Sequence, residues 1–256
     1  MMNFKPILIL VITLCFLGCK QEKMQVTRIE GKQISISDSL KANTEIETFI
    51  KPYRDHVNQD LDSVISFSKE TYSKKDGELN TAIGNLFADA IFEQCNPIFN
   101  NMTNNDIDIV LVNHGGIRSI ISKGNLTRRT AFKLMPFENS VVVASLNGHA
   151  VNELVSYLSK AKRAHPIHGL KIALDNDYNL IEATINNQPI DTTKTYYVAT
   201  NDYLYNGGDH MDFFKASDTM YNLNYKIRNV LLDYFKKTDT IQPEIDDRFL
   251  KVNNTK

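Results

Sequence analysis

The amino-acid sequence predicts a single α+β domain in which helices pack on a mixed β-sheet. Segments whose apolar residues recur at helical spacing alternate with short apolar segments that are typical of strands. Residues 170–174 and 180–185 are two strand candidates separated only by the turn-forming residues 175–179, which indicates a hairpin. A hairpin makes neighbouring strands antiparallel, so a purely parallel sheet is not expected.

The composition is that of an ordinary globular protein, and it excludes several functional classes. The 256 residues contain 29 Lys and Arg against 30 Asp and Glu, a net charge of −1, and 42% are hydrophobic. This balance excludes a disordered or collagen-like chain and argues against binding to nucleic acid, which requires a surplus of basic residues. Only one segment is strongly apolar, so the sequence is not that of a polytopic membrane protein.

The first residues have the features of a targeting signal. Lys5 precedes the uncharged residues 7–17, a segment too short to span a bilayer of about 30 Å and typical of a signal-peptide core. Gly18 before Cys19 resembles the bacterial lipobox, in which the cysteine is acylated and becomes the mature N-terminus. Because Phe16 replaces the usual leucine, a plain secretory signal is the alternative. We expect a lipid-anchored protein of the cell envelope, on the periplasmic face or at the cell surface.

The expected division of the chain is a lipoprotein signal peptide over residues 1–18, a polar tether over 19–43 and a folded domain over 44–256. Signal processing would remove Cys15 and lipidate Cys19, which leaves Cys95 as the remaining cysteine. An intramolecular disulfide is then not expected, even in an oxidising compartment. Cys95 is interpreted as a small buried apolar residue rather than as a nucleophile.

The expected domain begins with a helix over residues 44–57. Thr44 followed by Glu47 fits a capping box, and Pro52 is expected to kink or interrupt the helix. The apolar stripe of this helix consists of Ile46, Phe49, Ile50, Tyr53 and Val57. The polar segment before it contains one short strand candidate, residues 33–37.

Strand and helix patterns alternate along the rest of the chain. Residues 64–68 have strand character, residues 81–93 carry an apolar helical face, and residues 107–112 are a nearly continuous apolar run, as in a strand covered on both faces. The later elements are a helix over 127–135, a strand over 140–146, a helix after residue 147, strands over 170–174, 180–185 and 196–200, and a helix over 222–237. Thr127 and Asn147 are the expected N-caps of two of these helices.

The most informative motif is Asn-His-Gly-Gly-Ile-Arg at residues 113–118, directly after a predicted strand. Its glycines, Gly115 and Gly116, permit backbone N–H groups to approach a ligand closely. The guanidinium of Arg118 can bind phosphate or ribose oxygens through paired hydrogen bonds. Taken alone, the motif is better explained by a tight turn between a strand and a loop.

Two further loop motifs adjoin predicted strands. Residues 136–139 read Pro-Phe-Glu-Asn, and this motif in isolation favours Phe137 as part of the core over a ligand contact. Residues 201–209 combine aromatic side chains with two glycines and a final carboxylate, Asp209. Aromatic faces stack on nucleobases, and a carboxylate accepts paired hydrogen bonds from ribose hydroxyls.

In this order the motifs resemble those of the C-terminal domain of 5′-nucleotidases, a family that includes UDP-sugar hydrolases and 2′,3′-cyclic phosphodiesterases. The resemblance covers about residues 26–251 and implies the α+β fold of that domain. The matching segments are Gly-Asn-Leu-Phe-Ala-Asp-Ala at 84–90, residues 113–118 and 136–139, Asn-Gly-Gly-Asp at 206–209 and Asp-Arg-Phe at 247–249.

The resemblance implies a pocket that grips a nucleotide. The base would stack between Phe137 and Tyr203, and Asp209 would hold the ribose hydroxyls. Asn113 and Arg118 would contact the base, ribose or phosphate. The candidate substrate-binding residues are therefore Asn113, Gly115, Gly116, Arg118, Phe137, Tyr203, Gly207, Gly208 and Asp209.

The sequence departs from the family pattern at two histidines. His114 and His210 stand where the family has glycine, and they either narrow the pocket and donate to a phosphate or point to solvent. A metal site built from these histidines with Asp209 and Asp212 is a less favoured alternative, and we expect this chain to bind neither metal nor cofactor. Residues 165–168, His-Pro-Ile-His, are interpreted as an exposed loop.

In the family, a metallophosphoesterase domain precedes this one and holds two metal ions that activate water. The sequence lacks the set of signatures that marks it, which comprises Asp-x-His, Gly-Asp-x-x-Asp and Gly-Asn-His-Glu. Three hypotheses follow: the nucleotide-recognition part of a 5′-nucleotidase completed by a separately encoded metallophosphoesterase, a non-catalytic nucleotide- or nucleoside-binding lipoprotein, or a degenerate partner whose pocket no longer binds. The intact set of binding residues disfavours the third, and catalysis by this chain itself stays open.

Overall fold

The computed structural model describes residues 25–252. Contacts divide the chain into a short N-terminal unit that ends at Phe49 and a larger unit that begins at Ile50. The described residues before the first helix form no strand, so the strand expected at 33–37 is wrong, because no other strand pairs with it there. The predicted signal peptide and lipidation site at Cys19 lie outside the described residues. Within the described part, no helix is both long and apolar enough to cross a bilayer.

Helix α2 (Thr44–Leu61) is longer than predicted and continues through Pro52. The expected interruption is wrong, because a proline removes only one N–H from the ladder of helix hydrogen bonds. The side chain of Asn43 caps the helix by accepting from the backbone N–H of Glu45 at 2.9 Å and of Ile46 at 3.2 Å. The apolar stripe that the sequence indicates at Ile46, Phe49, Tyr53 and Val57 is exposed in this structure.

Five strands form the central sheet of the larger unit, in the order β10-β4-β9-β2-β5. They span Met220–Lys226 (β10), Ser140–Asn147 (β4), Thr195–Asn201 (β9), Ile109–Leu111 (β2) and Ile167–His168 (β5). Strands β2 and β9 are parallel, whereas the other neighbouring pairs are antiparallel. The predicted mixed sheet is therefore confirmed.

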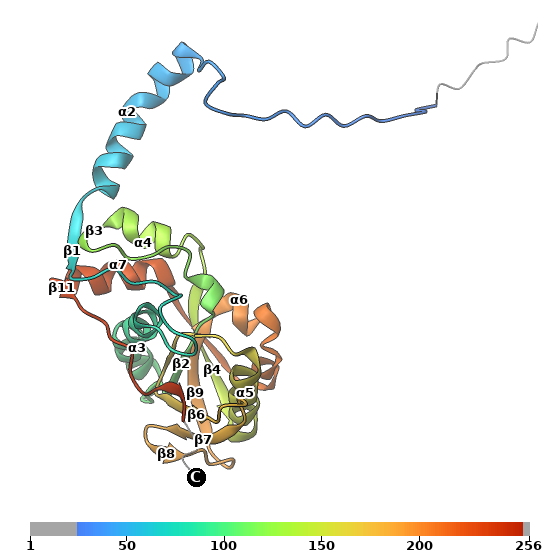
Figure 1. The fold of residues 1–256 in the computed structure, drawn as a ribbon, viewed down its shortest axis with the longest axis vertical. Coiled ribbons are helices and arrows are strands. Elements are labelled where there is room, and N and C mark those ends of the chain that lie inside the picture. The colour runs from blue at the N-terminus through green and yellow to red at the C-terminus, as the bar shows by residue number, and fades with distance from the viewer. Residues whose placement is uncertain (1–24, 253–256) are drawn as a thin grey trace, which may run out of the picture. The chain divides into compact units, whose positions relative to one another are not determined.

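The central sheet is buried on both faces, as the apolar run before residue 113 predicts. Val110 of β2 and Val143 of β4 belong to one hydrophobic core, and Ile109 and Leu111 of β2 belong to a second. This alternation follows from the period of two along a strand. The helices that cover it are α3 (Ala82–Thr103), α5 (Gly148–Ala161) and α7 (Ile227–Lys237), and α4 (Arg128–Leu134) packs against α7. Figure 1 shows α3 and α5 on opposite sides of the sheet.

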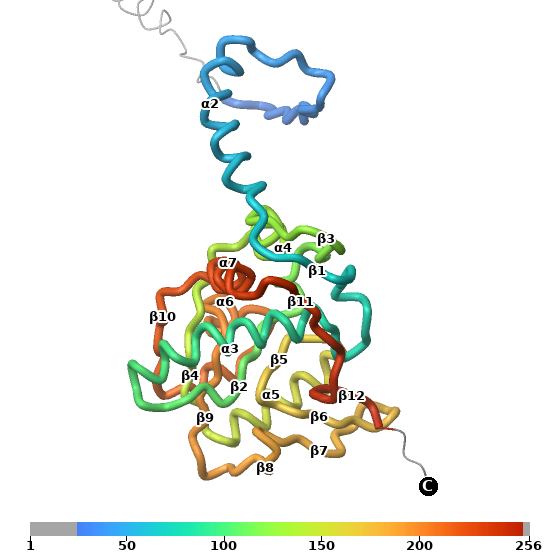
Figure 2. The backbone as a smooth tube through the Cα atoms, turned by 90° about the vertical axis from the view of Figure 1, so that its left-hand side faces the viewer, coloured from blue at the N-terminus to red at the C-terminus, as the bar shows by residue number. Residues whose placement is uncertain are grey.

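Two smaller sheets complete the described part of the larger unit. One has the order β11-β1-β3 and the other β12-β6-β7-β8, which lies at the lower end in Figure 2. Their strands are β1 (Val64–Ser68), β3 (Gly124–Thr127), β6 (Leu170–Leu174), β7 (Leu180–Ile185), β8 (Gln188–Pro189), β11 (Thr240–Ile241) and β12 (Phe249–Lys251). Strands β6 and β7 are antiparallel neighbours, so the predicted hairpin is confirmed.

Helix α3 extends ten residues beyond the predicted end at Glu93. Its buried face continues through Cys95 and Phe99, and the helix ends at Asn104, which is in the left-handed conformation. Thr81 accepts a hydrogen bond from the N–H of Gly84 at 3.2 Å and caps the start. Burial raises the pKa of the Cys95 thiol to about 12, so it stays protonated, as expected of a buried apolar residue rather than a nucleophile.

The last helix begins later than the sequence predicts. Residues 222–226 belong to strand β10, which pairs with β4 through Tyr221 opposite Val143, and α7 starts only at Ile227. The apolar spacing that indicated a helix includes Leu223, but this residue is buried as part of the strand. A short apolar pattern suits either element, and pairing with the exposed edge of β4 decides for the strand.

Two of the matching motifs are far apart in sequence but in contact in the structure. Arg248 donates to the carboxylate of Asp89 on α3 at 2.9 and 3.1 Å, and the Nδ1 atom of His168 lies 2.7 Å from the same carboxylate. Burial alone would raise the pKa of Asp89, but the hydrogen bonds from His168 and Arg248 outweigh it and hold that pKa below its usual range. These residues therefore attach the C-terminal segment to α3.

Candidate functional site

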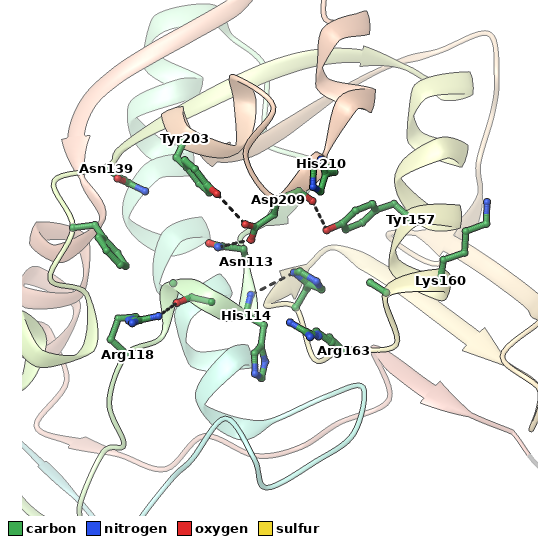
Figure 3. A pocket seen from close by; sticks show the side chains of 15 residues that line it. Asn113, His114, Arg118, Asn139, Tyr157, Lys160, Arg163, Tyr203, Asp209 and His210 are labelled. Carbon is green, nitrogen blue, oxygen red and sulfur yellow. Dashed lines mark hydrogen bonds between the residues drawn. The ribbon is translucent and has the colours of Figure 1, made fainter.

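A cavity of about 990 Å³ lies where loops from three neighbouring strands converge. The loop after β2, the loop before β4, the loop after β9 and the C-terminal end of α5 contribute its walls (Figure 3). Seven of the nine candidate binding residues line it, namely Asn113, Gly115, Gly116, Arg118, Phe137, Tyr203 and Asp209. Pairing of β9 with both β2 and β4 brings the three loops together.

The loop after β2 forms a 3₁₀ turn over His114–Gly116, and the N–H of Gly116 donates to the carbonyl of Asn113 at 3.0 Å. Asn113 is buried, and its side-chain amide donates to the carboxylate of Asp209 at 2.7 Å. Because β2 and β9 are parallel neighbours, the loops that follow them lie side by side, which permits this bond. The loop after β2 and the loop that carries Asp209 are thus joined by a side-chain hydrogen bond.

Asp209 is the centre of the site. Its Oδ2 accepts from Asn113, its Oδ1 accepts from the hydroxyl of Tyr203 at 3.0 Å, and its backbone carbonyl accepts from the hydroxyl of Tyr157 at 2.8 Å (Figure 3). Its φ of 52° lies in the left-handed region, a conformation that carboxamide and carboxylate residues tolerate better than most. Two side chains therefore hold the carboxylate in one orientation, and Tyr157 fixes the backbone that carries it.

Gly207 and Gly208 do not line the cavity, although the sequence places them among the binding residues. Gly207 has a φ of +90°, which favours glycine, and it turns the chain towards Asp209. A Cβ on Gly208 would lie 2.5 Å from the ring of Tyr203. These glycines therefore shape the loop and make room for the aromatic ring.

The two aromatic candidates are open to solvent. Phe137 is 42% exposed and Tyr203 is 48% exposed, so Phe137 is not part of the core. Tyr203 belongs to the short helix α6 (Asp202–Tyr205), which the side chain of Asn201 caps by accepting from the N–H of Leu204 at 2.8 Å. A cavity with exposed aromatic faces can take a planar ligand.

Arg118 lies beside one of these rings. Its guanidinium carbon is 5.7 Å from the centroid of the Phe137 ring, and its Nη1 lies 3.4 Å from the carbonyl of Gly115. The guanidinium therefore has donors left over for a ligand. The motif at residues 113–118 places both its glycines and its arginine on the wall of the cavity.

Arg228 of α7 fixes the loop that carries Phe137. The residue is 8% exposed, and its side chain donates to the carbonyls of Met135 at 3.2 Å and Phe137 at 3.1 Å and pairs with Glu138. None of the sequence motifs includes this residue. Its signal is a lone arginine within the otherwise apolar helical pattern that contains Ile227, Val230 and Leu231.

His165 corrects the interpretation of residues 165–168 as an exposed loop. The residue is only 7% exposed and lines the cavity, because residues 167 and 168 form β5 and pair with β2. Burial lowers the pKa of His165 to about 4, with a further lowering from His114 and an opposing effect of Asp209. The neutral ring can accept through Nδ1 from the N–H of His114, 3.4 Å away.

Other residues of the cavity come from α5 and the segment that follows it. Tyr157, Lys160 and Arg163 line the wall opposite the aromatic loops, and Asn139 lies near Tyr203 (Figure 3). The α5 residues carry no local sequence signal, because polar side chains on the solvent side of an amphipathic helix are ordinary. Only the packing of α5 beside the loop after β9 gives them a place in the site.

The two unusual histidines also line the cavity. Nδ1 of His114 lies 3.1 Å from the carbonyl of Ala164, so this ring is directed towards the protein. Residues 208–212 match the spacing Gly-Asp-x-x-Asp, but Asp212 pairs with Lys215 at 2.8 Å instead of joining Asp209. Among residues 25–252, no group of three or more His, Cys, Asp or Glu side chains is placed to hold a metal ion.

Solved structures share this fold. A 5′-nucleotidase precursor from Thermus thermophilus aligns with a TM-score of 0.68 and 22% identity over 80% of this chain and 43% of that protein. The NAD nucleotidase of Haemophilus influenzae aligns with a TM-score of 0.63 and 15% identity over 83% of this chain and 42% of that protein. At these identities the likeness establishes the fold.

Curated relatives agree with the structural neighbours. An apyrase of Tabanus yao is 24% identical over 86% of this chain and 44% of its own length, and the protein UshA of Escherichia coli is 24% identical over 87% and 40%. The trifunctional nucleotide phosphoesterase YfkN of Bacillus subtilis is 26% identical over 84% and 15%. The chain thus spans less than half the length of these relatives. Residues 58–216 match the family described as 5′-nucleotidase, C-terminal domain, and the chain belongs to that family.

Proposed function

We propose that this chain is the nucleotide-recognition half of a 5′-nucleotidase-type phosphohydrolase that acts in nucleotide catabolism. The observation that carries this proposal is the position of Asp209, whose fixed carboxylate lies in one cavity with Phe137, Tyr203 and Arg118. This set offers a recognition group for each part of a nucleotide. The name of YfkN, a trifunctional nucleotide phosphoesterase with a region similar to this chain, supports the same class of ligand.

In this proposal the base lies between the exposed rings of Phe137 and Tyr203, whose faces can stack on it. A carboxylate has about four lone-pair positions, and Asn113 and Tyr203 use two of those of Asp209, so two are left for ribose hydroxyls. The phosphate binds Arg118, whose guanidinium can form paired hydrogen bonds. The backbone N–H of Gly115 adds a donor at close range, whereas that of Gly116 is used within the turn.

Hydrolysis in this proposal depends on a separately encoded metallophosphoesterase chain. Two metal ions in such a domain activate water and polarise the phosphate. The residues of this chain bind and orient the nucleotide, and divalent metals act only on the partner. Anchoring through lipidated Cys19 would hold the protein at the cell envelope, and a relative named cell wall protein Lmo0130 of Listeria monocytogenes supports an envelope location.

Reconstitution tests this division of labour. The purified chain with Zn²⁺, Mn²⁺ or Mg²⁺ is expected to release no phosphate from nucleoside monophosphates, and addition of a metallophosphoesterase from the same genome is expected to raise turnover above that of the partner alone. The Asp209→Asn variant should reduce the gain. Chelator-sensitive phosphate release that co-elutes with the isolated chain would contradict the proposal.

The same experiment separates the alternative, a non-catalytic nucleotide- or nucleoside-binding lipoprotein. If the chain binds nucleotide but leaves the partner's rate unchanged, the binding-lipoprotein hypothesis is favoured. If calorimetry detects no nucleotide or nucleoside binding, both hypotheses are wrong, and a degenerate pocket is the remaining explanation.

A further inference from the structure

Asp209 divides the cavity into two halves of different chemistry. Figure 3 shows Arg118 and Tyr203 on one side of Asp209, and Arg163, Lys160 and His210 on the other. The first half contains the proposed base and phosphate contacts. The second half, defined by His114, Tyr157, Lys160, Arg163, His165 and His210, is called the basic half below.

The basic half carries positive charge without a matching carboxylate. Arg163 and Lys160 have no ion pair or side-chain hydrogen bond among residues 25–252, whereas comparable exposed cations such as Lys171 and Lys215 pair with aspartates at 2.8 Å. Asp209 is the single carboxylate on the cavity wall, and both of its oxygens already accept hydrogen bonds. An anion from solution would therefore find unneutralised donors there.

Titration of the neighbouring groups indicates the same positive potential. Burial lowers the pKa of His114, and the charges of Lys74 and Arg163 lower it further. Burial also lowers the pKa of Lys74, and the charges of Arg118, Lys75 and Arg163 lower it further. Both groups therefore lie where positive charges are close together, and a bound anion would relieve this repulsion.

The departures from the family pattern lie in this same half. His114 and His210 replace glycines of the matching motifs, and both line the cavity. Even a neutral imidazole carries one N–H donor, which the side chain of a glycine at the same position lacks. The cavity of about 990 Å³ is at the upper end of the roughly 300–1,000 Å³ found for small-molecule sites, so it has room for a group beyond a nucleoside monophosphate.

We infer that the basic half is a second subsite, which binds a further phosphoryl group of the nucleotide through Arg163 and Lys160. The inference rests on the proposed function and deepens it: the preferred ligand is a nucleoside carrying a pyrophosphate or a longer phosphate chain, not a nucleoside monophosphate. The base and ribose stay at the aromatic rings and at Asp209, and the extended phosphates reach past Asp209 towards Arg163.

Calorimetry at low salt with inorganic pyrophosphate, a nucleoside, its monophosphate and its diphosphate tests the subsite. The diphosphate is expected to bind about tenfold more tightly than the monophosphate. Arg163→Gln combined with Lys160→Gln should weaken diphosphate and pyrophosphate binding about fivefold to tenfold and leave nucleoside binding unchanged. Lys171→Gln, which removes a charge outside the cavity, should change none of the affinities.

The outcomes separate the subsite from the proposed function. Absence of pyrophosphate binding, or equal pyrophosphate affinity in the double variant and the wild type, would overturn the subsite even if nucleosides bind. Loss of pyrophosphate binding in the double variant without any nucleoside binding would support an anion subsite and contradict nucleotide recognition. Thermal melts of the double variant are the control for structural damage at the C-terminal end of α5. Such damage would lower the melting temperature and all of the affinities together.

Discussion

Among single residues, Phe137 and Tyr203 give the sharpest test of the cavity. Stacking on one aromatic side chain contributes about 1–3 kcal/mol, so Phe137→Ala and Tyr203→Ala should each weaken nucleotide binding by about fivefold to 150-fold. Both side chains are more than 40% exposed, and the melting temperature should change little. Titration calorimetry and thermal melts measure the two effects.

The control for this pair is Tyr203→Phe, which keeps the ring and removes only the hydroxyl that donates to Asp209. It should retain most of the stacking affinity. Unchanged affinity in both alanine variants would contradict the stacking of a base in this cavity. A large loss of stability in Phe137→Ala would instead indicate that Phe137 has a structural role.

Asp209→Asn should weaken the binding of ribonucleotides more than the binding of 2′-deoxynucleotides. The carboxylate can accept from both ribose hydroxyls, and hydrogen bonds to a charged group contribute about 1.5–3 kcal/mol, so ribonucleotide binding should weaken about tenfold or more. Binding of 2′-deoxynucleotides, which lack one of these hydroxyls, should weaken less. Calorimetry with both sugars measures the ratio, and an equal loss for the two would show that Asp209 does not contact the 2′-hydroxyl.

His165 predicts a dependence of stability on pH. Its pKa is about 4 in the folded protein against an ordinary value of 6.5, so the unfolded chain binds the proton more readily. The associated stability is complete above pH 6.5 and is lost as the pH falls towards 4, by about 3 kcal/mol in total.

Urea unfolding at pH 7, 5.5 and 4.5 measures this loss against the His165→Gln variant. The variant is expected to start less stable and to lose less stability over the same range. Carboxylates with lowered pKa, such as Asp89, contribute mainly below this window because their ordinary value is 3.8. Parallel pH profiles for the two proteins would show that His165 is not the group responsible.

At the scale of elements, the position of one loop depends on a helix distant in sequence. Arg228 of α7 holds the carbonyls of Met135 and Phe137, so Arg228→Met should leave these acceptors without their donor. The free energy of unfolding should fall by about 2 kcal/mol, and nucleotide affinity should fall as Phe137 loses its place. Denaturant unfolding and calorimetry measure both quantities.

Lys236→Met on the same helix is the matched control, because its pair with Asp233 at 3.1 Å is exposed. Exposed pairs contribute about 0–1 kcal/mol, so this variant should keep its stability and its affinity. If Arg228→Met retains full stability and nucleotide affinity, the loop is held by other contacts.

At the scale of the whole molecule, the sequence predicts attachment to a membrane through Cys19. Cys19→Ser should move the protein from the membrane fraction to the soluble fraction, because a lipid chain contributes about 0.8 kcal/mol per buried CH₂ group. Cell fractionation and intact-mass measurement of the wild type check the prediction. A wild-type protein without acyl mass, together with a variant that stays on the membrane, would contradict the lipobox interpretation.

Local sequence determined much of this protein. Helix starts at Thr81, Thr127 and Asn147 follow from caps that act within one turn, and the hairpin of β6 and β7 follows from a short turn between two strand patterns. The motifs also predicted residues that line the cavity, because each motif is a short loop next to a strand. A short segment carries each of these signals by itself, because the interacting groups are close to one another along the chain.

Other features depended on contacts between distant segments, which no local pattern records. Pairing with β4 made residues 220–226 a strand although their spacing also suited a helix. Pairing of β5 with β2 buried His165, and packing of α5 beside the loop after β9 brought Tyr157 to Asp209. The sequence alone thus determined which loops carry the candidate binding groups. The tertiary structure decided their common orientation around Asp209 and the charge of the basic half, because burial and pairing act only once the sheet has assembled.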